Sequence, residues 1–198
     1  MRIGIDIDDT TVKTVDSMIK YADLFDKQLG GNGINGNMGL INNRYYLKAL
    51  YGWNDEEKNK FFNIYYKKIL EECICIPNSA EIIQKLKNEG HEIFFITARL
   101  INIENCDTEK ITLKTLNENK IPYDKVIINA SDKLRVCQEC RIELFIEDSF
   151  ETCKELEENG IKTYLMTTPM NRNIDVGNVE RISDWLDLDK KIHNYLDK

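Results

Sequence analysis

The sequence contains no apolar run that approaches the roughly 20 residues needed to span a bilayer. Its N-terminus opens directly on a strand-like segment, with no signal-peptide stretch before it. A basic excess is also missing, since the formal net charge is −7, and this argues against a general nucleic-acid-binding protein. We therefore expect a cytoplasmic protein whose partners are neither a membrane nor a nucleic acid polymer.

Histidine is scarce, with two residues that stand apart in the sequence. The sequence contains six cysteines and shows no export signal, so we expect their thiols to be reduced. Cys137 and Cys140 have zinc-like or redox-like spacing, and Cys73 and Cys75 could supply two more ligands. A structural zinc site is the less favoured interpretation, because a true zinc ribbon pairs two such turns with tighter loops.

What the sequence does contain is an alternation of strand-like and helix-like segments. Nearly continuous apolar runs, typical of parallel strands covered on both faces, lie at residues 2–7, 92–97, 125–128, 142–147 and 161–166. Helical patterns lie at residues 79–89, 108–119, 150–159 and 183–197. The alternation predicts an α/β fold with a doubly wound parallel sheet.

One interval breaks this alternation. Between Asp9 and Pro77 the sequence shows no convincing strand, only helical patterns around residues 14–29, 43–51 and 55–73. We therefore predict a core formed by residues 1–13 and 77–198 and a small helical cap at residues 14–76. The cap is rich in aromatic residues. Most of them should pack its own core, and one or two could face the site and stack on a ring.

Polar residues follow four of the predicted strands. They are Asp6, Asp8, Asp9 and Thr10, then Thr97, Ala98 and Arg99, then Ser131 and Lys133, then Glu147, Asp148 and Ser149. Ligands of open parallel sheets bind at these strand ends. Carboxylates about 4 Å apart repel by about 4 kcal/mol per pair at an effective dielectric of about 20, so either some of them are protonated or a divalent cation lies among them. Oxygen ligands favour Mg²⁺ over zinc, and a nearby lysine and threonine suit a phosphoryl group.

These four groups, in this order, resemble the four motifs of the haloacid dehalogenase-like phosphatases. The first motif is the segment Asp-Ile-Asp-Asp-Thr at residues 6–10; Thr97, Lys133 and the pair Glu147 and Asp148 match the others. The resemblance covers nearly the whole chain, and the helical insertion stands where this family carries its cap. It implies a Rossmann-like core and a phosphoryl group transferred to an aspartate.

The resemblance also implies a role for each matching residue. Asp6 would be the nucleophile and Asp8 the proton donor and acceptor. Magnesium would be held by Asp6, Asp8 through its backbone carbonyl, and Asp148, with Glu147 beside them or bound through water. Thr97, Ala98 and Lys133 would hold the phosphoryl oxygens. Arg99 is a further candidate for the phosphate, with a structural salt bridge as its alternative; Asn171 and Arg172 are weaker candidates on a late loop.

A narrower resemblance is to the 5′(3′)-deoxyribonucleotidases and their bacterial relatives. It is carried by residues 131–133, 145–149, 160–164 and 168–172. The chain departs from that group at Glu147, where the usual residue is Asp, and at Thr97, where Ser is frequent. We expect a phosphatase acting on nucleoside monophosphates, with a sugar phosphate or another small phosphomonoester as the alternative. A non-enzymatic phospho-switch and a catalytically silent binding module are disfavoured, because the cap and the full residue set argue against both.

Overall fold

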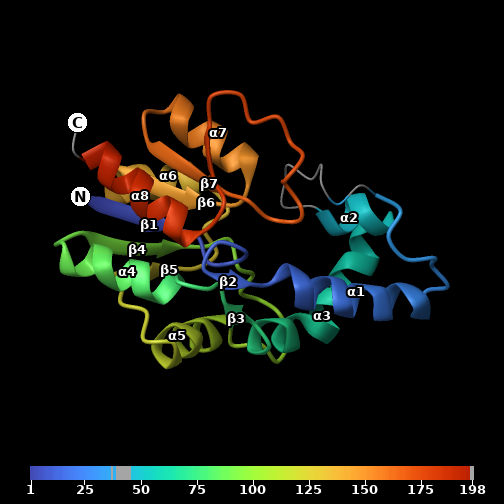
Figure 1. Cartoon of the computed structure of the whole chain (residues 1–198). Coiled ribbons are helices and arrows are strands. Elements are labelled where there is room, and N and C mark those ends of the chain that lie inside the picture. The colour runs from blue at the N-terminus through green and yellow to red at the C-terminus, as the bar shows by residue number, and fades with distance from the viewer. Residues whose placement is uncertain (37, 39–45, 197–198) are drawn as a thin grey trace.

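The computed structural model describes residues 1–36, 38 and 46–196 of the chain. Within these residues six strands form one parallel sheet in the order β5-β4-β1-β6-β7-β8 (Figure 1). The strands are β1 (Arg2–Ile5), β4 (Glu92–Ile96), β5 (Lys125–Ile127), β6 (Leu144–Glu147), β7 (Lys162–Met166) and β8 (Glu180–Ile182). The α/β fold with a doubly wound parallel sheet is confirmed, and all five predicted strands are present.

Helices cover both faces of this sheet, and alternate strand residues fill two apolar cores. In β4, Ile93 and Phe95 pack with residues of α4 (Ser79–Asn88), α5 (Thr108–Glu118) and α8 (Trp185–Leu196). The neighbouring Phe94 and Ile96 pack with residues of α6 (Lys133–Cys140) and α7 (Phe150–Glu158). Because successive side chains of a strand point to opposite faces, a strand covered on both sides is apolar throughout.

The helix bounds follow local capping signals. Asp107 and Ser149 precede α5 and α7, and the side chain of each accepts a hydrogen bond from a backbone N–H in the first turn. Asp132 caps α6 in the same way, although the sequence patterns did not indicate this helix. After α4, Gly90 adopts a φ of 88°, which glycine tolerates best. None of the described helices is both long and apolar enough to cross a membrane.

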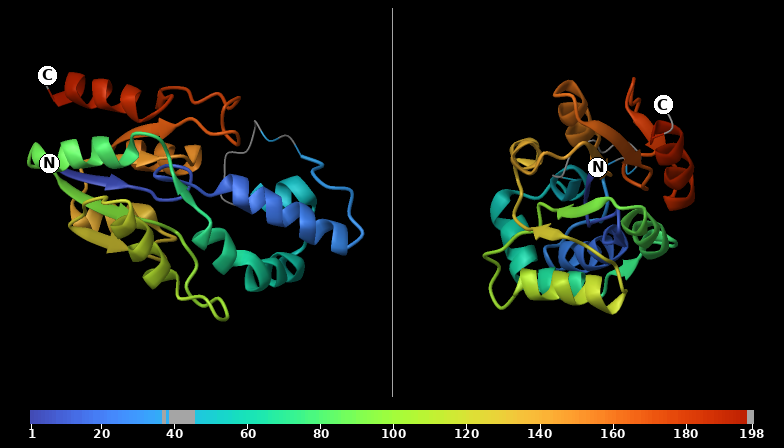
Figure 2. Two further views of the ribbon diagram at one scale, coloured as in Figure 1. Left: turned by 60° about the horizontal axis from the view of Figure 1, so that its bottom comes forward. Right: turned by 90° about the vertical axis from the view of Figure 1, so that its left-hand side faces the viewer.

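The interval between the first and second core strands forms a helical insertion. It contains α1 (Val15–Gln28), α2 (Tyr46–Tyr51) and α3 (Asp55–Glu71); residues 43–45 of the second expected helix, and residue 197 of the last, lie outside the described residues. The insertion lies beyond one end of the sheet, and the N-terminus lies at the opposite end (Figure 2). Its core is largely aromatic, with Phe25, Tyr51, Trp53 and Phe61 buried together.

The expectation that no strand lies between Asp9 and Pro77 was wrong. Two short strands, β2 (Val12–Lys13) and β3 (Ile74–Cys75), pair antiparallel with each other at the two ends of the helical insertion. Strands of two residues each are too short to show the alternation by which strands are recognised. The edge strand β8 was missed as well, since two of its three residues are charged.

Candidate active site

The carboxyl ends of β1, β4 and β6 meet the helical insertion around a cavity of about 420 Å³. Every residue assigned to the site from the sequence lines it: Asp6, Asp8, Thr97, Ala98, Arg99, Lys133, Glu147 and Asp148. They come from four segments that are far apart in the chain, and the parallel sheet brings them together because its strands all end at one edge. The cavity therefore gathers the predicted residue set at the place where such folds bind ligands.

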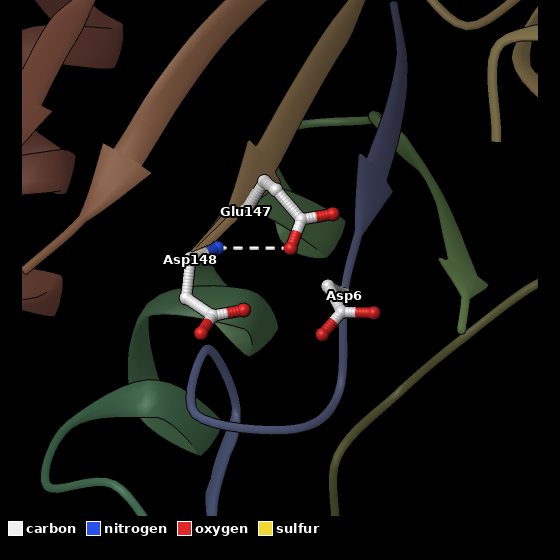
Figure 3. Close-up of side chains that lie close together, drawn as sticks. All are labelled: Asp6, Glu147 and Asp148. Carbon is white, nitrogen blue, oxygen red and sulfur yellow. Dashed lines mark hydrogen bonds between the residues drawn. The ribbon is translucent and has the colours of Figure 1, made fainter. Parts of the chain in front are cut away.

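An acidic cluster lies at the ends of β1 and β6. It consists of Asp6, Glu147 and Asp148, each of which offers a carboxylate oxygen within 4.8 Å of the others (Figure 3). Lys133 reaches into it from the start of α6, and its Nζ atom lies 2.6 Å from Asp6 and 2.5 Å from Glu147. The other Glu147 oxygen accepts the backbone N–H groups of Asp148 and Ser149 at 3.0 and 3.1 Å. Both Glu147 oxygens thus have protein donors.

The charges of the acidic cluster do not balance, because it has three carboxylates and one ammonium, which contacts Asp6 and Glu147. Burial raises the pKa of Asp6 to about 7, and the nearby Glu147 and Asp8 carboxylates add to this while Lys133 acts against it. Burial followed by Glu147 raises the pKa of Asp148 well above its ordinary value. A hard divalent cation such as Mg²⁺ takes oxygen ligands. The donor set at Asp6 and Asp148 therefore fits a magnesium ion.

Asp8 lies in a different environment, although it is only two residues from Asp6. Its carboxylate accepts hydrogen bonds from Nε and Nη2 of Arg99 at 2.8–3.2 Å and from the Thr14 hydroxyl at 2.5 Å. The remaining Arg99 nitrogen donates to the hydroxyl of Thr112 at 2.9 Å. Burial alone would raise the pKa of Asp8, but Arg99 and then Thr14 outweigh it and hold that pKa below its ordinary value.

Arg99 therefore forms the salt bridge that the sequence left as one of two alternatives. Its side chain is 1% exposed and directed at Asp8. Thr97, also fully buried, accepts the Arg99 backbone N–H on its hydroxyl at 3.3 Å. Arg99, whose other candidate partner was a phosphate, thus links the loop after β4 to Asp8.

The remaining residues of the first motif organise the turn after β1. Asp9 has a φ of 56°, and one of its carboxylate oxygens accepts the backbone N–H groups of Thr14 and Val15 at the start of α1. The Thr10 carbonyl accepts a hydrogen bond from the Trp185 indole at 2.9 Å. Thr11, which the sequence reasoning passed over, donates its hydroxyl to the Asp6 carbonyl at 2.8 Å. No sequence signal distinguished Thr11 from its neighbour.

The helical insertion supplies the opposite wall of the cavity. Its lining residues, which the sequence did not single out, are Met18, Leu47, Lys48, Lys58, Asn59 and Leu70. Two insertion aromatics, Phe62 and Tyr66, also line the cavity, in agreement with the expectation that one or two would do so. The Tyr66 hydroxyl accepts the backbone N–H of Leu100 at 2.8 Å, which links α3 to the loop after β4.

The other sequence candidates lie apart from the cavity wall. Asn171 is buried, and its side-chain nitrogen donates to the Asp148 carbonyl at 2.7 Å, whereas Arg172 is exposed. Cys137 is buried in the core beneath α6, with Cys140 partly buried beside it. Among the described residues, the acidic cluster is the only group of three acids, histidines or cysteines close enough to hold a metal ion.

Comparison with known proteins places this fold and site in a family. No family model matches the sequence. A nucleotidase from Clostridium acetobutylicum is 30% identical over 143 residues, which are 72% of this chain and 71% of that protein. A Bacillus cereus protein named "putative nucleotidase" is 29% identical over 95% of this chain and 96% of its own length.

Solved structures agree on the fold. A hydrolase of the haloacid dehalogenase-like family from Streptococcus pneumoniae superposes with a TM-score of 0.69 and 16% identity, over 98% of this chain and 97% of that one. The chain therefore belongs to the same family as the Clostridium acetobutylicum nucleotidase, and it has the fold of the haloacid dehalogenase-like hydrolases. It is a phosphoric monoester hydrolase whose relatives in sequence carry the name nucleotidase.

Proposed function

We propose that this protein hydrolyses phosphomonoesters with Mg²⁺ through an aspartyl-phosphate on Asp6. The observation that carries the proposal is the acidic cluster, in which Asp6 and Asp148 face each other and share too little positive charge. Asp6, Asp148 and the backbone carbonyl of Asp8 would hold the ion. Bound there, Mg²⁺ would neutralise this excess and the charge of the phosphoryl group.

In the proposed reaction the Asp6 carboxylate attacks phosphorus and the ester oxygen leaves. Because Arg99 holds the pKa of Asp8 below its ordinary value, Asp8 first takes up a proton from solvent or from a singly protonated phosphoryl group. It then donates that proton to the leaving oxygen and accepts one from the water that hydrolyses the aspartyl-phosphate. Lys133 lies 2.6 Å from Asp6, where its ammonium acts against the rise in the pKa of the nucleophile and can bind a phosphoryl oxygen. We assign Thr97 and Ala98 to the same oxygens.

The role we propose for Arg99 is to hold Asp8. Its guanidinium binds both Asp8 oxygens and the Thr112 hydroxyl, which engages three of its five N–H groups and directs it at Asp8. The Thr14 hydroxyl binds the same carboxylate from the start of the insertion. Asp8 is thereby fixed from the core on one side and from the helical insertion on the other, so that its orientation depends on how the two meet.

We further propose that the helical insertion, residues 14–76, acts as a cap over the active site. We also propose that the substrate is a nucleoside monophosphate. The names of the relatives support this, and so does the wall formed by Phe62, Tyr66 and Met18, an apolar and aromatic surface that suits a planar base. The cavity of about 420 Å³ has the size of a small-molecule site. The cap would close over a small substrate and exclude bulk water.

A substrate series with a built-in control tests this proposal. Phosphate release is measured with dUMP, dTMP, a 3′-monophosphate and 2-deoxyribose 5-phosphate, each with Mg²⁺ and with EDTA. Because 2-deoxyribose 5-phosphate presents the sugar and phosphate of dUMP and dTMP without a base, its kcat/KM shows what the base contributes. We expect kcat/KM to be about 10-fold or more higher for a nucleotide, as one stacked base contributes about 1–3 kcal/mol. Equal rates with and without the base would instead favour a sugar-phosphate phosphatase, and full activity in EDTA would contradict the metal.

A further inference from the structure

Asp148 lies in the short turn between β6 and α7, where no strand or helix ladder fixes its backbone. Its N–H group is nevertheless bound, because it donates to the Glu147 carboxylate at 3.0 Å. Its carbonyl is bound too, by the side-chain nitrogen of Asn171 at 2.7 Å. Two side chains therefore hold the two polar groups of this residue, and its carboxylate faces Asp6 (Figure 3).

Asn171 is 1% exposed, and the hydrogen-bonding capacity of its side-chain amide is fully used. The nitrogen donates to the carbonyls of Asp148 and Met166 at 2.7 and 2.8 Å. The oxygen accepts from the backbone N–H of Thr168 at 3.1 Å and from Arg181 at 2.9 Å. Two acceptors on one side and two donors on the other fix which way the amide points.

Arg181 holds Asn171 in place from the edge strand β8. Besides binding the amide oxygen, its guanidinium donates to the backbone carbonyls of Asn171 and Ile174, both at 3.1 Å. The ends of β6, β7 and β8 are thus joined through one buried amide. Backbone hydrogen bonds would be enough to join two loops. Here the Asn171 side chain instead donates a hydrogen bond to Asp148, the residue of the turn whose carboxylate faces Asp6.

We propose that Asn171, oriented by Arg181, is a positioning residue that sets the place of the Asp148 carboxylate and thereby the affinity of the site for Mg²⁺. The inference rests on the proposed magnesium site. Residues that orient metal ligands from behind commonly change metal affinity by about 10–100-fold when they are replaced. Asn171 touches neither the ion nor the substrate in this assignment, so its loss should weaken metal binding and leave the chemistry at saturating metal largely intact.

The test is Mn²⁺ binding to the full chain, followed by electron paramagnetic resonance, in Asn171→Leu. Leucine keeps the approximate size of the side chain, removes its polar atoms and adds no charge. We expect the Mn²⁺ Kd to rise about 10-fold or more. The Mg²⁺ concentration for half-maximal phosphatase activity should rise in parallel, while kcat at saturating Mg²⁺ stays within about threefold of wild type.

The matched control is Asn119→Leu, since the side-chain nitrogen of this exposed residue at the C-terminal end of α5 also donates to a backbone carbonyl, that of Thr115 at 2.8 Å. Its Kd should equal that of wild type. A merely structural role would lower the melting temperature of Asn171→Leu and leave its Kd unchanged, which would overturn the proposal. If Asn171→Leu does not fold, Arg181→Met is compared in the same way, and an unchanged Kd there counts equally against it.

Asp148→Asn separates this inference from the proposed function. If wild type binds Mn²⁺ and Asp148→Asn does not, while Asn171→Leu binds as tightly as wild type, the positioning role alone is wrong. If Asp148→Asn binds Mn²⁺ as tightly as wild type, the magnesium site itself is wrong and the positioning role falls with it.

Discussion

Two aspartates separated by one residue occupy opposite electrostatic environments. Asp6 belongs to the acidic cluster, which has three carboxylates and one ammonium, and burial raises its pKa to about 7. Asp8 forms an ion pair with the Arg99 guanidinium, and Arg99 together with Thr14 outweighs burial and keeps the pKa of Asp8 below its ordinary value. Environments that separate the pKa values of neighbouring carboxyls mark residues with different tasks. The imbalance at Asp6 calls for a cation, whereas the balance at Asp8 does not.

The largest effect is expected from Asp6→Asn, which removes the nucleophile. Hydrolysis of p-nitrophenyl phosphate in the presence of Mg²⁺ should fall by about 10³-fold or more, and circular dichroism should show an unchanged fold. Asp16→Asn makes the same chemical change on the exposed face of α1 and should leave the rate unaltered. Full activity in Asp6→Asn would remove the basis of the aspartyl-phosphate mechanism.

The comparison between Asp8 and Asp148 sharpens the division of tasks. Asp8→Asn should lower kcat by about 10²–10⁴-fold, the usual contribution of a general acid and base, and leave the Mn²⁺ Kd nearly unchanged because only the Asp8 backbone is assigned to the ion. Asp148→Asn should raise the Mn²⁺ Kd by about 100-fold or more. Calorimetric titration of both variants with Mn²⁺ measures the two Kd values. Loss of metal binding in Asp8→Asn would contradict the assignment of only the Asp8 backbone to the ion.

A smaller effect is expected from breaking the ion pair between Asp8 and Arg99. Arg99→Met leaves Asp8 without its cation, and since the Asp8 side chain is 30% exposed, the loss should be less than for a fully buried pair, about 2 kcal/mol in the free energy of unfolding. Arg135→Met removes an exposed arginine that pairs with Asp132 and Glu139 and should change stability by less than about 1 kcal/mol. Urea unfolding measures both. Equal losses of unfolding free energy in the two variants would show that the Asp8–Arg99 pair stabilises the fold no more than an exposed ion pair does.

The acidic cluster also predicts how the metal-free protein responds to pH. A carboxyl whose pKa is higher in the folded state gives its full contribution to stability below its unfolded pKa and loses it as the pH rises through the folded pKa. For Asp6 this window runs from 3.8 to about 7. In EDTA we expect the free energy of unfolding to fall between pH 5 and 7.5 by on the order of 2 kcal/mol. Asp8, whose pKa is lowered, contributes no loss in this range.

Two comparisons isolate that effect. Saturating Mg²⁺ should abolish most of the decrease, because the ion neutralises the ionised cluster. Asp6→Asn should also show a shallower decrease than wild type in EDTA. If the metal-free wild type has the same free energy of unfolding at pH 7.5 as at pH 5, repulsion within the acidic cluster does not destabilise the fold.

The sequence predicted the parts of the fold whose local pattern is strong. The buried strands appear as apolar runs, as in β4, and the helix starts at Asp107 and Ser149 carry recognisable caps. It did not predict β2 or β3, because strands of two residues have no measurable period, and it did not predict β8, because two of its three residues are charged. The helix α6 was not predicted either, although Asp132 is a residue type that favours the N-cap position.

For the site, motif order was enough to bring the acids, Thr97 and Lys133 to one cavity. It was not enough to choose partners. Arg99 could as well have met a phosphate, and only the folded chain shows Asp8 within 2.8 Å of its guanidinium. The bond from Asn171 to the Asp148 carbonyl joins residues in different loops, and a sequence pattern contains no information on which backbone group a distant amide will meet.

The short β2–β3 pairing has a consequence for protein engineering. Lys13 and Ile74 are direct partners across this ribbon, so the chain comes back to within one strand spacing of the point where it leaves the core. A two-residue Asn-Gly turn is the usual connection between strands paired in this way. We therefore expect that residues 14–73 can be exchanged for a tight turn or for the corresponding segment of a relative between Lys13 and Ile74, while β1 and β6, which precede Asp6 and Asp148, keep their register.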